Sequence, residues 1–392
     1  MTEEVFIVAA RRTPIGSFQG ALTPLTAPQL GAVAIQAAVK DSTLAPELIE
    51  EAIIGCVLMA GIGQAPGRQA VLAGGLPQKV PTTTVNKMCG SGLKALMMAS
   101  DQIRAGSANI VLAGGIESMT NAPYLIPKAR AGLRMGHSEI LDHMFFDGLQ
   151  SPFDGQMMGA FGEATAKKYG FTRQQQDDFA AESVRRAMAA INDGKFDREV
   201  APVTVKDRKG ERLIDKDETP FNCDIAKIPN LKPAFAKDGT VTAASSAGIS
   251  DGAAAAVLVS GSALKQHNLK PLARIVGYTS FAQAPEWFTT APVGAIKALL
   301  EKTGWRADQV DLYEINEAFA VVPMAAIRDI GLDHAKVNVN GGACALGHPI
   351  GATGARITTT LVHALRERGL KRGIAALCIG GGEATAIAIE IV

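Results

Sequence analysis

Cys89 is placed in the sequence where a thiol could act as a nucleophile. The threonine-rich run before it, residues 80–85, predicts a strand, and apolar residues recur at helical spacing over residues 93–103. Cys89 therefore lies on a predicted turn from strand to helix. The free N–H groups at a helix start favour thiolate over thiol, lower a cysteine pKa from about 8.5 towards neutrality, and can hold an oxyanion. The competing interpretation is a small buried hydrophobic side chain, which free cysteine usually is.

Two further motifs supply the partners that a thiol catalyst needs. Residues 340–354 surround His348 with five glycines and one proline, which predicts a rigid loop rather than a helix. His348 is the only residue of this loop that titrates near pH 7, although histidines also occur as packed core residues. Cys378 ends an apolar run and precedes the glycines at 380–382, a pattern that alone is also typical of an ordinary turn. Together, two cysteines and a histidine at glycine-rich strand ends predict one assembled site.

Other kinds of site fit these residues less well. Cys344 and His348 are four residues apart, but the glycines and proline argue against the helix that this zinc spacing requires, and no further ligands follow. We therefore expect no metal. The glycines match neither a P-loop nor a dinucleotide fingerprint, so no nucleotide cofactor is expected. A cysteine hydrolase would use the same histidine, with Asn316 as its orienting group, but it would not need Cys378.

The elements that must position these residues alternate along the chain, as in an α/β layer. Helix-length segments separate short predicted strands at 5–10, 52–57, 81–85 and 109–113. After residue 272 the order returns, with a strand at 273–278, a helix at 293–302, a strand at 310–315, a helix from 317 and a strand at 337–340. Val85 matches Val339 and Leu112 matches Leu377, at offsets of 254 and 265 residues, which indicates an internal duplication. Two packed copies would bring their strand-end loops together, where ligands of open α/β sheets bind.

The duplication predicts three units, namely an N-terminal half at 1–119 plus 250–271, an inserted lobe at 120–249 and a C-terminal half at 272–392. The lobe breaks the alternating pattern with prolines, methionines and basic residues. Its residues 172–192 carry an apolar stripe at helical spacing, which predicts an amphipathic helix. Residues 206–212 mix both charge signs and predict a solvated hairpin.

Composition and charge exclude several classes of protein. The formal net charge of the 392 residues is +1, so neither a nucleic-acid partner nor a charged membrane surface is indicated. Five cysteines, an odd number, argue against a disulfide framework and favour a reducing compartment, by default the cytoplasm. Acidic residues precede the first short apolar run, the reverse of a signal peptide, and no apolar stretch of about 18 residues is present to span a bilayer.

Six motifs follow one another along the chain. They are Arg-Arg-Thr-Pro-Ile-Gly at 11–16, Asn-Lys-Met-Cys-Gly-Ser-Gly at 86–92, Ala-Gly-Gly-Ile-Glu-Ser-Met at 113–119, Asn-Glu-Ala-Phe-Ala at 316–320, Gly-His-Pro-Ile-Gly at 347–351 and Cys-Ile-Gly-Gly-Gly at 378–382. In this order, and over essentially the full length, they resemble the thiolase family. Residues 61–70 and 114–119 are similar to the biosynthetic acetoacetyl-CoA thiolases, the acetyl-CoA C-acetyltransferases. The resemblance implies an α/β thiolase fold layered α-β-α-β-α, a loop lobe that covers coenzyme A, and a homotetramer built as a dimer of dimers.

The resemblance also implies a reaction, the reversible Claisen condensation of two acetyl-CoA to acetoacetyl-CoA and CoA. In the family, the residue at Cys89 takes the acyl group as a thioester, the one at His348 activates it, and the one at Cys378 removes a proton from the second acetyl-CoA. The enolate oxygen meets His348 and a water held by Asn316, and the acyl oxygen meets the N–H groups of Cys89 and Gly380. No cofactor is implied, because the coenzyme A thioester is the substrate. The alternatives are a broad-chain 3-ketoacyl-CoA thiolase and, more remotely, a non-catalytic acyl-CoA carrier.

Contacts to coenzyme A transfer from the family with departures. The implied contact residues are Leu149, Met158, Phe235, Ala243, Ser246, Ala247, Phe288, Ala318 and Phe319. Ser-Ser-Ala-Gly at 245–248 stands where the family has Asn-Ala-Ser-Gly, so the expected serine is Ala247 or has shifted to Ser246. Met157 replaces a histidine and Phe288 replaces a methionine near the acyl end. These changes leave the acyl-chain preference open.

Overall fold

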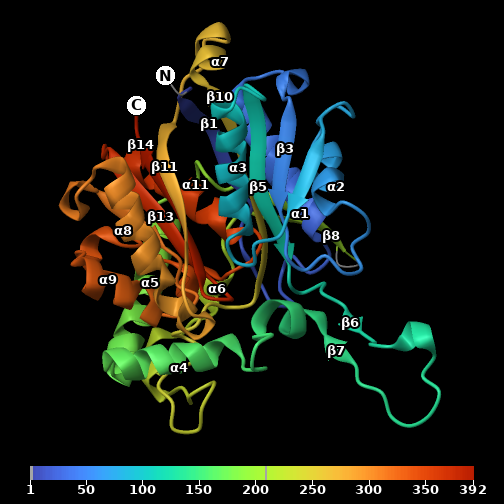
Figure 1. Cartoon of the computed structure of the whole chain (residues 1–392), viewed down its shortest axis with the longest axis vertical. Helices are drawn as coiled ribbons and strands as arrows, with labels where there is room; N and C mark the ends of the chain where they lie inside the picture. The colour runs from blue at the N-terminus through green and yellow to red at the C-terminus, as the bar shows by residue number, and fades with distance from the viewer. Residues whose placement is uncertain (1–2, 208–209) are drawn as a thin grey trace.

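The computed structural model describes residues 3–207 and 210–392. Its main sheet consists of two half-sheets that repeat one strand order (Figure 1). The N-terminal half-sheet runs in the order β4 (Thr82–Val85), β3 (Glu51–Gly55), β5 (Ile110–Ser118), β10 (Ser250–Ser260) and β1 (Val5–Arg12). The C-terminal half-sheet runs in the order β12 (Leu312–Ile315), β13 (Arg372–Ile379), β14 (Glu383–Glu390) and β11 (Ala273–Ala282). The short strand β2 (Gly16–Ser17) pairs with β10.

The pairing directions repeat as well. β5 is parallel to β3, as β13 is to β12, while β10 and β14 are each antiparallel to both neighbours. β4 continues the first half-sheet in parallel, and a single parallel bridge from Val337 to Tyr313 takes its place in the second. Among the described strands, the half-sheets join where residues 5–7 of β1 pair with residues 273–275 of β11. The topology therefore shows the duplication that the sequence predicts.

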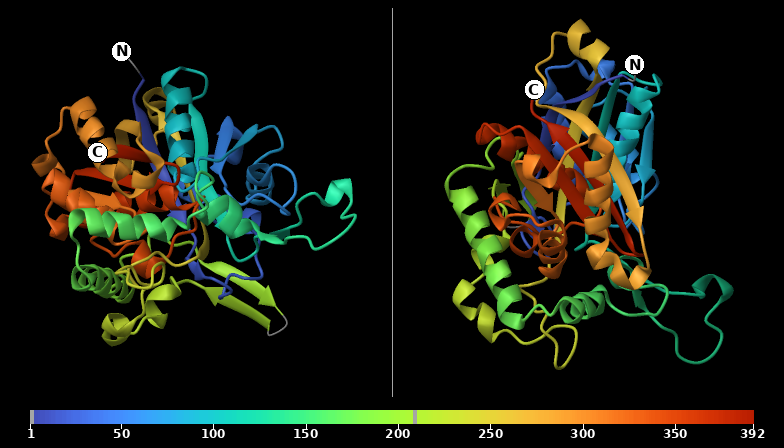
Figure 2. Two further views of the ribbon diagram at one scale, coloured as in Figure 1. Left: turned by 60° about the horizontal axis from the view of Figure 1, so that its bottom comes forward. Right: turned by 60° about the vertical axis from the view of Figure 1, so that its left-hand side comes forward.

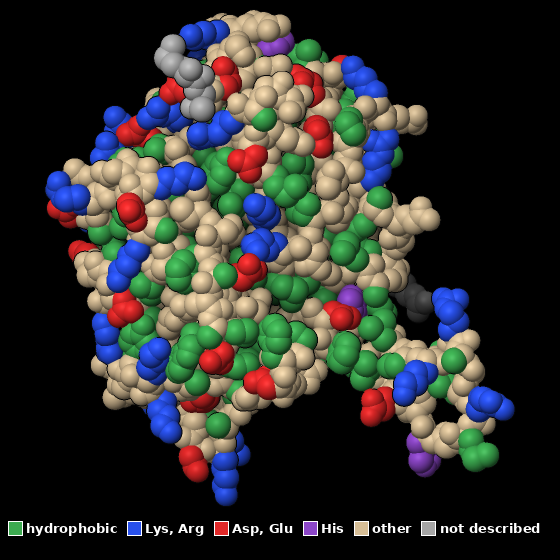
Figure 3. Space-filling model, in the orientation of Figure 1, with side chains coloured by type: hydrophobic (Ala, Val, Ile, Leu, Met, Phe, Trp, Pro, Cys, Tyr) green, Lys and Arg blue, Asp and Glu red, His purple; other side chains and the backbone are tan. Residues whose placement is uncertain are grey.

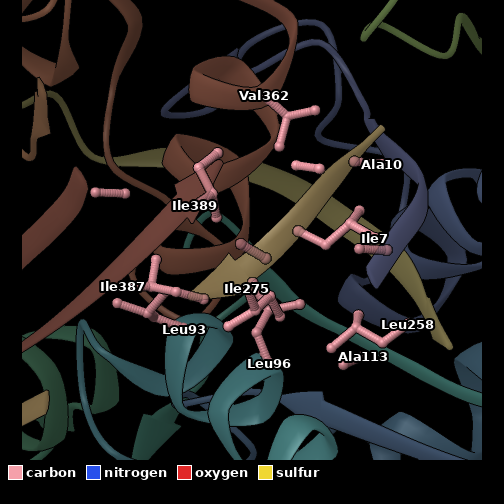
Figure 4. Packing of buried hydrophobic residues seen from close by; sticks show 14 of the residues in the cluster. Ile7, Ala10, Leu93, Leu96, Ala113, Leu258, Ile275, Val362, Ile387 and Ile389 are labelled. Atoms are coloured by element: carbon pink, nitrogen blue, oxygen red, sulfur yellow. The ribbon is translucent and has the colours of Figure 1, made fainter. Parts of the chain in front are cut away.

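Helices complete five layers in the predicted order α-β-α-β-α (Figure 2). α3 (Ser91–Arg104) and α11 (Thr353–Glu367) contact each other and fill the space between the half-sheets. Figure 4 shows Leu93 and Leu96 of α3 packed towards strand residues such as Ile275. The outer faces are covered by α1 (Ala27–Ser42) and α2 (Pro66–Ala73) on the N-terminal side and by α8 (Ala291–Thr303) and α9 (Val321–Ile330) on the C-terminal side.

Small residues make this layering possible at the centre of the first half-sheet. Every residue of β10 is buried, and residues 253–256 are all alanine. Both α1 and α11 contact this strand, one on each face. Because interiors are packed at the density of organic crystals, larger side chains at these positions would force the layers apart.

The lobe adds its own helices and two hairpins. They are α4 (Met158–Tyr169), α5 (Arg173–Asn192), α6 (Thr219–Asn222), the pair β6 (Tyr124–Leu125) and β7 (Leu141–Asp142), and the pair β8 (Val203–Asp207) and β9 (Gly210–Ile214). α5 confirms the helix predicted at 172–192. A capping box starts it, because Thr172 accepts the N–H of Gln175 at 3.2 Å and Gln175 accepts that of Thr172 at 2.9 Å. The hairpin predicted at 206–212 is β8–β9, although residues 208–209 lie outside the described part.

Shorter elements complete the description. α7 (Gly261–Gln266) follows β10, and α10 (Ala343–Leu346) precedes α11. Short 3₁₀ segments lie at Pro46–Leu48, Ala129–Ala131, Ile225–Asn230, Pro285–Thr290, Ala307–Gln309 and His334–Lys336, and a π-helical turn lies at Phe145–Leu149. No helix within residues 3–207 and 210–392 is both long and apolar enough to cross a bilayer. The unit boundaries at 119, 249 and 271 stay predictions.

Two predicted elements near the site are wrong in part. Residues 340–354 are not loop throughout, because α10 forms one helical turn before His348 and α11 starts at Thr353. The helix predicted from 317 begins only at Val321, since the backbone before it pairs with another segment: the N–H of Ala247 donates to the carbonyl of Ala318 at 3.0 Å.

The strand predicted at 337–340 shrinks to the single bridge at Val337. The chain turns at Asn338, whose φ is +50°. Its side-chain amide then does what a strand backbone would do, since it accepts the N–H of Ile315 and donates to the carbonyl of Ile315, both at 2.8 Å. A side chain thus replaces two ladder bonds at this edge.

Candidate active site

Cys89 lies on a strained turn between β4 and α3, where the sequence predicted it. Met88, just before it, has a φ of +46°, which costs energy for a residue with a side chain. Side-chain bonds hold this conformation. Asn86 accepts the N–H of Met88 at 2.9 Å, while the hydroxyl of Ser91 accepts the N–H of Lys87 at 2.8 Å and donates to the carbonyl of Met88 at 2.7 Å.

The glycine turn after Cys378 lies directly against the Cys89 turn. The backbone N–H groups of Gly380 and of Cys89 itself lie close enough to the sulfur of Cys89 to favour its ionised form. A Cβ on Gly90 would come within 2.4 Å of the terminal carbon of Ile379, so a larger residue at position 90 would require the Ile379 side chain to move. The two thiols are close enough for Cys89 to raise the pKa of Cys378, which burial already places well above its ordinary value. The two predicted cysteines therefore share one site.

An ion pair joins the same two turns. The ammonium of Lys87 lies 2.6 Å from the carboxylate of Glu383, the first residue of β14, and both side chains are partly exposed. The pair connects the N-terminal half, which carries Cys89, to the C-terminal half, which carries Cys378. It therefore adds to the contacts that hold the two sulfur-bearing turns in register.

The predicted lowering of the Cys89 pKa is wrong. Burial raises the pKa of this thiol to about 11 and outweighs the two N–H donors, which act to lower it. The charge of Glu117 raises it slightly further. Desolvation of a thiolate is costly, and α3 starts two residues later, so its free N–H groups do not compensate. Cys89 is therefore a thiol near neutral pH, and it needs a base to become a nucleophile.

His348 is held in the tautomer that a base requires. The hydroxyl of Thr353 donates to the carbonyl of Pro349 at 2.9 Å, so its oxygen accepts the Nδ1–H of His348 at 2.6 Å. The hydrogen-bond network thus assigns the proton to Nδ1 and leaves a lone pair on Nε2, which faces the amide nitrogen of Asn316 at 3.5 Å. Burial, with a smaller contribution from Arg356, lowers the pKa of His348 to about 3, so the ring is neutral.

Asn316 lies at the end of β12 beside β13. Its backbone N–H donates to the carbonyl of Ala376, two residues before Cys378, at 3.0 Å. Its side chain is buried, and the amide oxygen has no hydrogen-bond partner among the described residues. A buried acceptor without a partner is costly unless a water or ligand donates to it. This oxygen is therefore suited to hold a water or a substrate group next to His348.

The His348 loop also packs against the start of α3. A Cβ on Gly92 would lie 3.0 Å from the carbonyl oxygen of Gly351, and a Cβ on Gly354 would lie 2.3 Å from the backbone of Leu93. The loop residue Ile350 belongs to the same apolar cluster as Cys89. The structure thus brings together all five predicted catalytic residues, which are Cys89, Asn316, His348, Cys378 and Gly380.

Several predicted coenzyme A residues meet at the junction of the lobe and the C-terminal half. Phe235 and Phe319 pack edge to face with ring centroids 5.8 Å apart. Ser246 forms a β-bridge with Phe319, and Ala247 bonds to Ala318 as described above. Met158 starts α4 next to Gly159, against which the ring of Phe235 lies. These contacts form one partly exposed wall.

The remaining predicted contacts are more scattered. Leu149 packs in the apolar cluster with Cys89 rather than in the wall. Phe288 is only 3% exposed and packs edge to face on Phe161. Ala243 is exposed. The hydroxyl of Ser246 donates to the carbonyl of Thr242 at 2.7 Å, so it can only accept from a ligand.

Two residues near the site had no predicted role. Thr353 fixes the histidine, and its signal in the sequence was a hydroxyl five residues after His348 and four after Pro349. Glu117 is fully buried at the end of β5, and an acid in an otherwise apolar run was its signal. Among residues 3–207 and 210–392 no group of three or more His, Cys, Asp or Glu is arranged to hold a metal ion.

Known families and proteins match the chain over almost its whole length. The family model described as "Thiolase, N-terminal domain" matches residues 5–262, and "Thiolase, C-terminal domain" matches residues 269–391. The chain is 48% identical over 389 residues to an acetyl-CoA acetyltransferase of Pseudomonas aeruginosa, with 99% of each protein covered.

Solved structures match equally well. An acetyl-CoA acetyltransferase of Bacillus anthracis superposes with a TM-score of 0.97 at 42% identity, covering 100% of this chain and 99% of that one. A thiolase from Ascaris suum in complex with coenzyme A superposes with a TM-score of 0.94 at 44% identity, covering 99% of this chain and 100% of that one.

Proposed function

Because the chain belongs to the thiolase family, we propose that it is an acetyl-CoA acetyltransferase that converts two acetyl-CoA to acetoacetyl-CoA and CoA, and catalyses the reverse thiolysis. The observation that supports this most strongly is the pairing of two thiols on facing turns, beside a neutral histidine and an asparagine with a free acceptor. Acyl transfer alone needs one sulfur. Carbon–carbon bond formation needs a second group that removes a proton from carbon.

In the proposed first half-reaction, the sulfur of Cys89 attacks the carbonyl carbon of acetyl-CoA and the bond to the coenzyme A sulfur breaks. Nε2 of His348 takes the Cys89 proton, since both groups are neutral at rest. The departing coenzyme A thiolate takes the proton of Cys378. The acyl oxygen is stabilised by the N–H groups of Cys89 and Gly380, and each such donor is typically worth about 3 kcal/mol of barrier. The products are acetyl-Cys89, a protonated His348 and a Cys378 thiolate.

In the proposed second half-reaction, the Cys378 thiolate takes a methyl proton from a second acetyl-CoA. The protonated Nε2 of His348 and a water on Asn316 stabilise the enolate oxygen. The enolate carbon attacks acetyl-Cys89, the carbon–sulfur bond breaks, and the Cys89 thiolate regains its proton from His348. Cys89, His348 and Cys378 all regain their resting protonation states, with the methyl proton now on Cys378 and the first Cys378 proton on the released CoA. We therefore expect the cycle to need no metal and no cofactor.

The substrate range is the direct test of this proposal. We expect the protein to cleave acetoacetyl-CoA with free CoA. Cleavage of 3-ketohexanoyl-CoA and 3-ketodecanoyl-CoA is expected to be at least about tenfold slower. The reason is that Leu149 and Met119 crowd Cys89, and one misfitting methylene costs about 1–3 kcal/mol. Initial rates at matched concentrations, with Cys89→Ala as the blank, measure this. Comparable rates on long chains would instead support a broad-chain 3-ketoacyl-CoA thiolase. Tight acyl-CoA binding with no turnover would support a carrier.

We also propose a homotetramer in a cytoplasmic, reducing setting, in which all five free cysteines stay unpaired. Two features support self-association. β4 is the terminal strand of its half-sheet, and the arm at residues 126–140 stands away from the body with Leu133 and Met135 exposed (Figure 3). Exposed edge strands and apolar patches typically mark interfaces.

Light scattering tests the oligomeric state. The intact protein is expected to have the mass of four chains. A variant in which a short glycine linker replaces residues 127–139 is expected to lose one of the two interfaces and to have the mass of two chains, because the arm supplies apolar contact area. A monomer for the intact protein would contradict the proposal.

A further inference from the structure

Glu117 is surrounded by hydrogen-bond donors from two different segments. It is fully buried near the end of β5. Its Oε2 accepts the N–H of Val57 at 3.1 Å and that of Gly351 at 2.9 Å, and its Oε1 accepts the N–H of Leu58 at 3.1 Å. The thiol of Cys56 lies 3.9 Å from Oε1. Both oxygens therefore face donors only, which an acceptor-only carboxylate satisfies and an amide or apolar side chain does not.

These donors belong to opposite halves of the fold. Val57 and Leu58 follow β3 of the N-terminal half and pack in the apolar cluster that includes Cys89. Gly351 is in the His348 loop of the C-terminal half, three residues after the histidine. The single carboxylate thus bonds the loop that carries the proposed base to the segment that packs around the proposed nucleophile.

The contact is too tight for other residues at two glycine positions. A Cβ on Gly351 would lie 2.7 Å from Oε2 of Glu117, and a Cβ on Gly115 would lie 2.2 Å from the carbonyl oxygen of Gly351. The His348 loop therefore rests directly on the backbone of β5. Because no free space separates the two, a change in the Glu117 side chain is expected to displace the His348 loop.

The other end of the loop is held by its own half together with the lobe, which supplies Ser183 from α5. The buried carboxylate of Glu317 accepts the N–H of Cys344 at 3.0 Å, the hydroxyl of Ser183 at 2.7 Å and the amide of Asn338 at 2.8 Å. His348 thus lies between an anchor at Cys344, which keeps the loop on the C-terminal half, and an anchor at Gly351, which ties it across to the N-terminal half. The second anchor adds a charged hydrogen bond to the close glycine contacts that set the loop against the segment carrying Cys89.

We infer that Glu117 is a positioning residue that fixes His348 relative to Cys89 across the two halves of the fold. The kinetic part of this inference rests on the proposed function, whereas the structural part does not. Burial raises the pKa of Glu117 to about 7 despite its three N–H donors, so the protein keeps this acid at an energetic cost that packing alone does not explain.

The test compares Glu117→Gln and Glu117→Asp with the matched control Asp251→Asn. Asp251 is equally buried on the neighbouring strand β10, but its carboxylate bonds to Ser118 and Thr120. In acetoacetyl-CoA thiolysis, the Glu117 variants are expected to lower kcat on the order of 10- to 100-fold with KM changed less than twofold, because misplacement of a catalytic group slows chemistry and leaves the coenzyme A wall intact. The control should keep both constants within about twofold. Glu117→Asp keeps the charge, but its side chain is too short to reach the N–H of Gly351. This variant provides the test if Glu117→Gln does not fold.

A second measurement needs no turnover. Hydrogen exchange of the peptide that covers residues 340–354 should become at least about tenfold faster in the Glu117 variants and stay unchanged in Asp251→Asn. Aspartate is too short to accept the Gly351 N–H, and glutamine places an NH2 group against N–H donors of the same cluster. Unchanged exchange with folded protein would overturn the inference, as would equal losses in kcat for the Glu117 variants and the control. If the intact protein shows no thiolysis, the proposed function fails, and hydrogen exchange still decides whether Glu117 anchors the loop.

Discussion

Replacing Cys89 by alanine is expected to abolish thiolysis of acetoacetyl-CoA, with a loss in kcat of at least about 10⁴-fold, because the proposed reaction passes through a thioester on this sulfur. The N–H groups of Cys89 and Gly380 converge on the position that the sulfur occupies. A water molecule in the space left by alanine would not carry the acyl group through the second half-reaction. The loss is therefore expected in both directions of the reaction.

Two measurements check this result. Steady-state rates follow the loss of acetoacetyl-CoA, and mass spectrometry after incubation with acetyl-CoA alone should detect an acetyl adduct on the intact protein but not on the variant. Cys223→Ala is the matched control, because Cys223 is also a free, partly buried cysteine but lies in the lobe. Full activity of Cys89→Ala beside an active control would refute the mechanism.

The position of Cys89 could be predicted from sequence, whereas its pKa could not. A threonine-rich strand followed by a helical period is a local pattern, and the structure places β4 and α3 at those residues. The pKa depends on long-range packing, since the loop with His348 and the turn after Cys378 both cover the thiol. Burial then dominates, and the thiol is harder to ionise than the helix start alone suggests.

The layered fold could be predicted because the chain contains its pattern twice. Matching strand ends at Val85 and Val339 indicated the duplication, and the repeated strand order confirms it. The prediction was wrong where a side chain took over a backbone role. Nothing local indicates that the amide of Asn338 would replace a strand, or that residues 317–320 would pair with 245–247 before α9 begins. Both depend on partners far away in the sequence.

The same limit applies to the groups that hold the site. Glu117 lies in a motif that was identified, but its four donor contacts come from residues 56–58 and from Gly351, which only the folded chain brings together. Thr353 is close to His348 in sequence, yet its role requires knowing that its own proton is donated to Pro349. Residues that are able to act as nucleophiles, acids or bases can be recognised in a sequence. The hydrogen bonds that orient them cannot.

Replacing Cys378 by alanine is expected to separate the two half-reactions. Removing a general base typically costs about 10²- to 10⁴-fold, so condensation and deuterium uptake from D₂O into the methyl group of acetyl-CoA should fall by that factor. Acetylation of Cys89 should persist at a reduced rate, because a thiolate leaves readily without a proton. The expected variant therefore still forms the acetyl adduct but makes and breaks carbon–carbon bonds far more slowly than the intact protein.

Both half-reactions are measured on the same sample of the variant. Formation of the acetyl adduct shows that the site is folded, and it therefore serves as the control for the loss of deuterium uptake. Cys378→Ser, which keeps nearly the same volume at this fully buried position, guards against an effect of the small cavity that alanine leaves. Serine is a much weaker acid than cysteine, so it too should lose deuterium uptake. Uptake at the rate of the intact protein in either folded variant would show that another group removes the carbon-bound proton, and the two-thiol argument for a thiolase reaction would then fail.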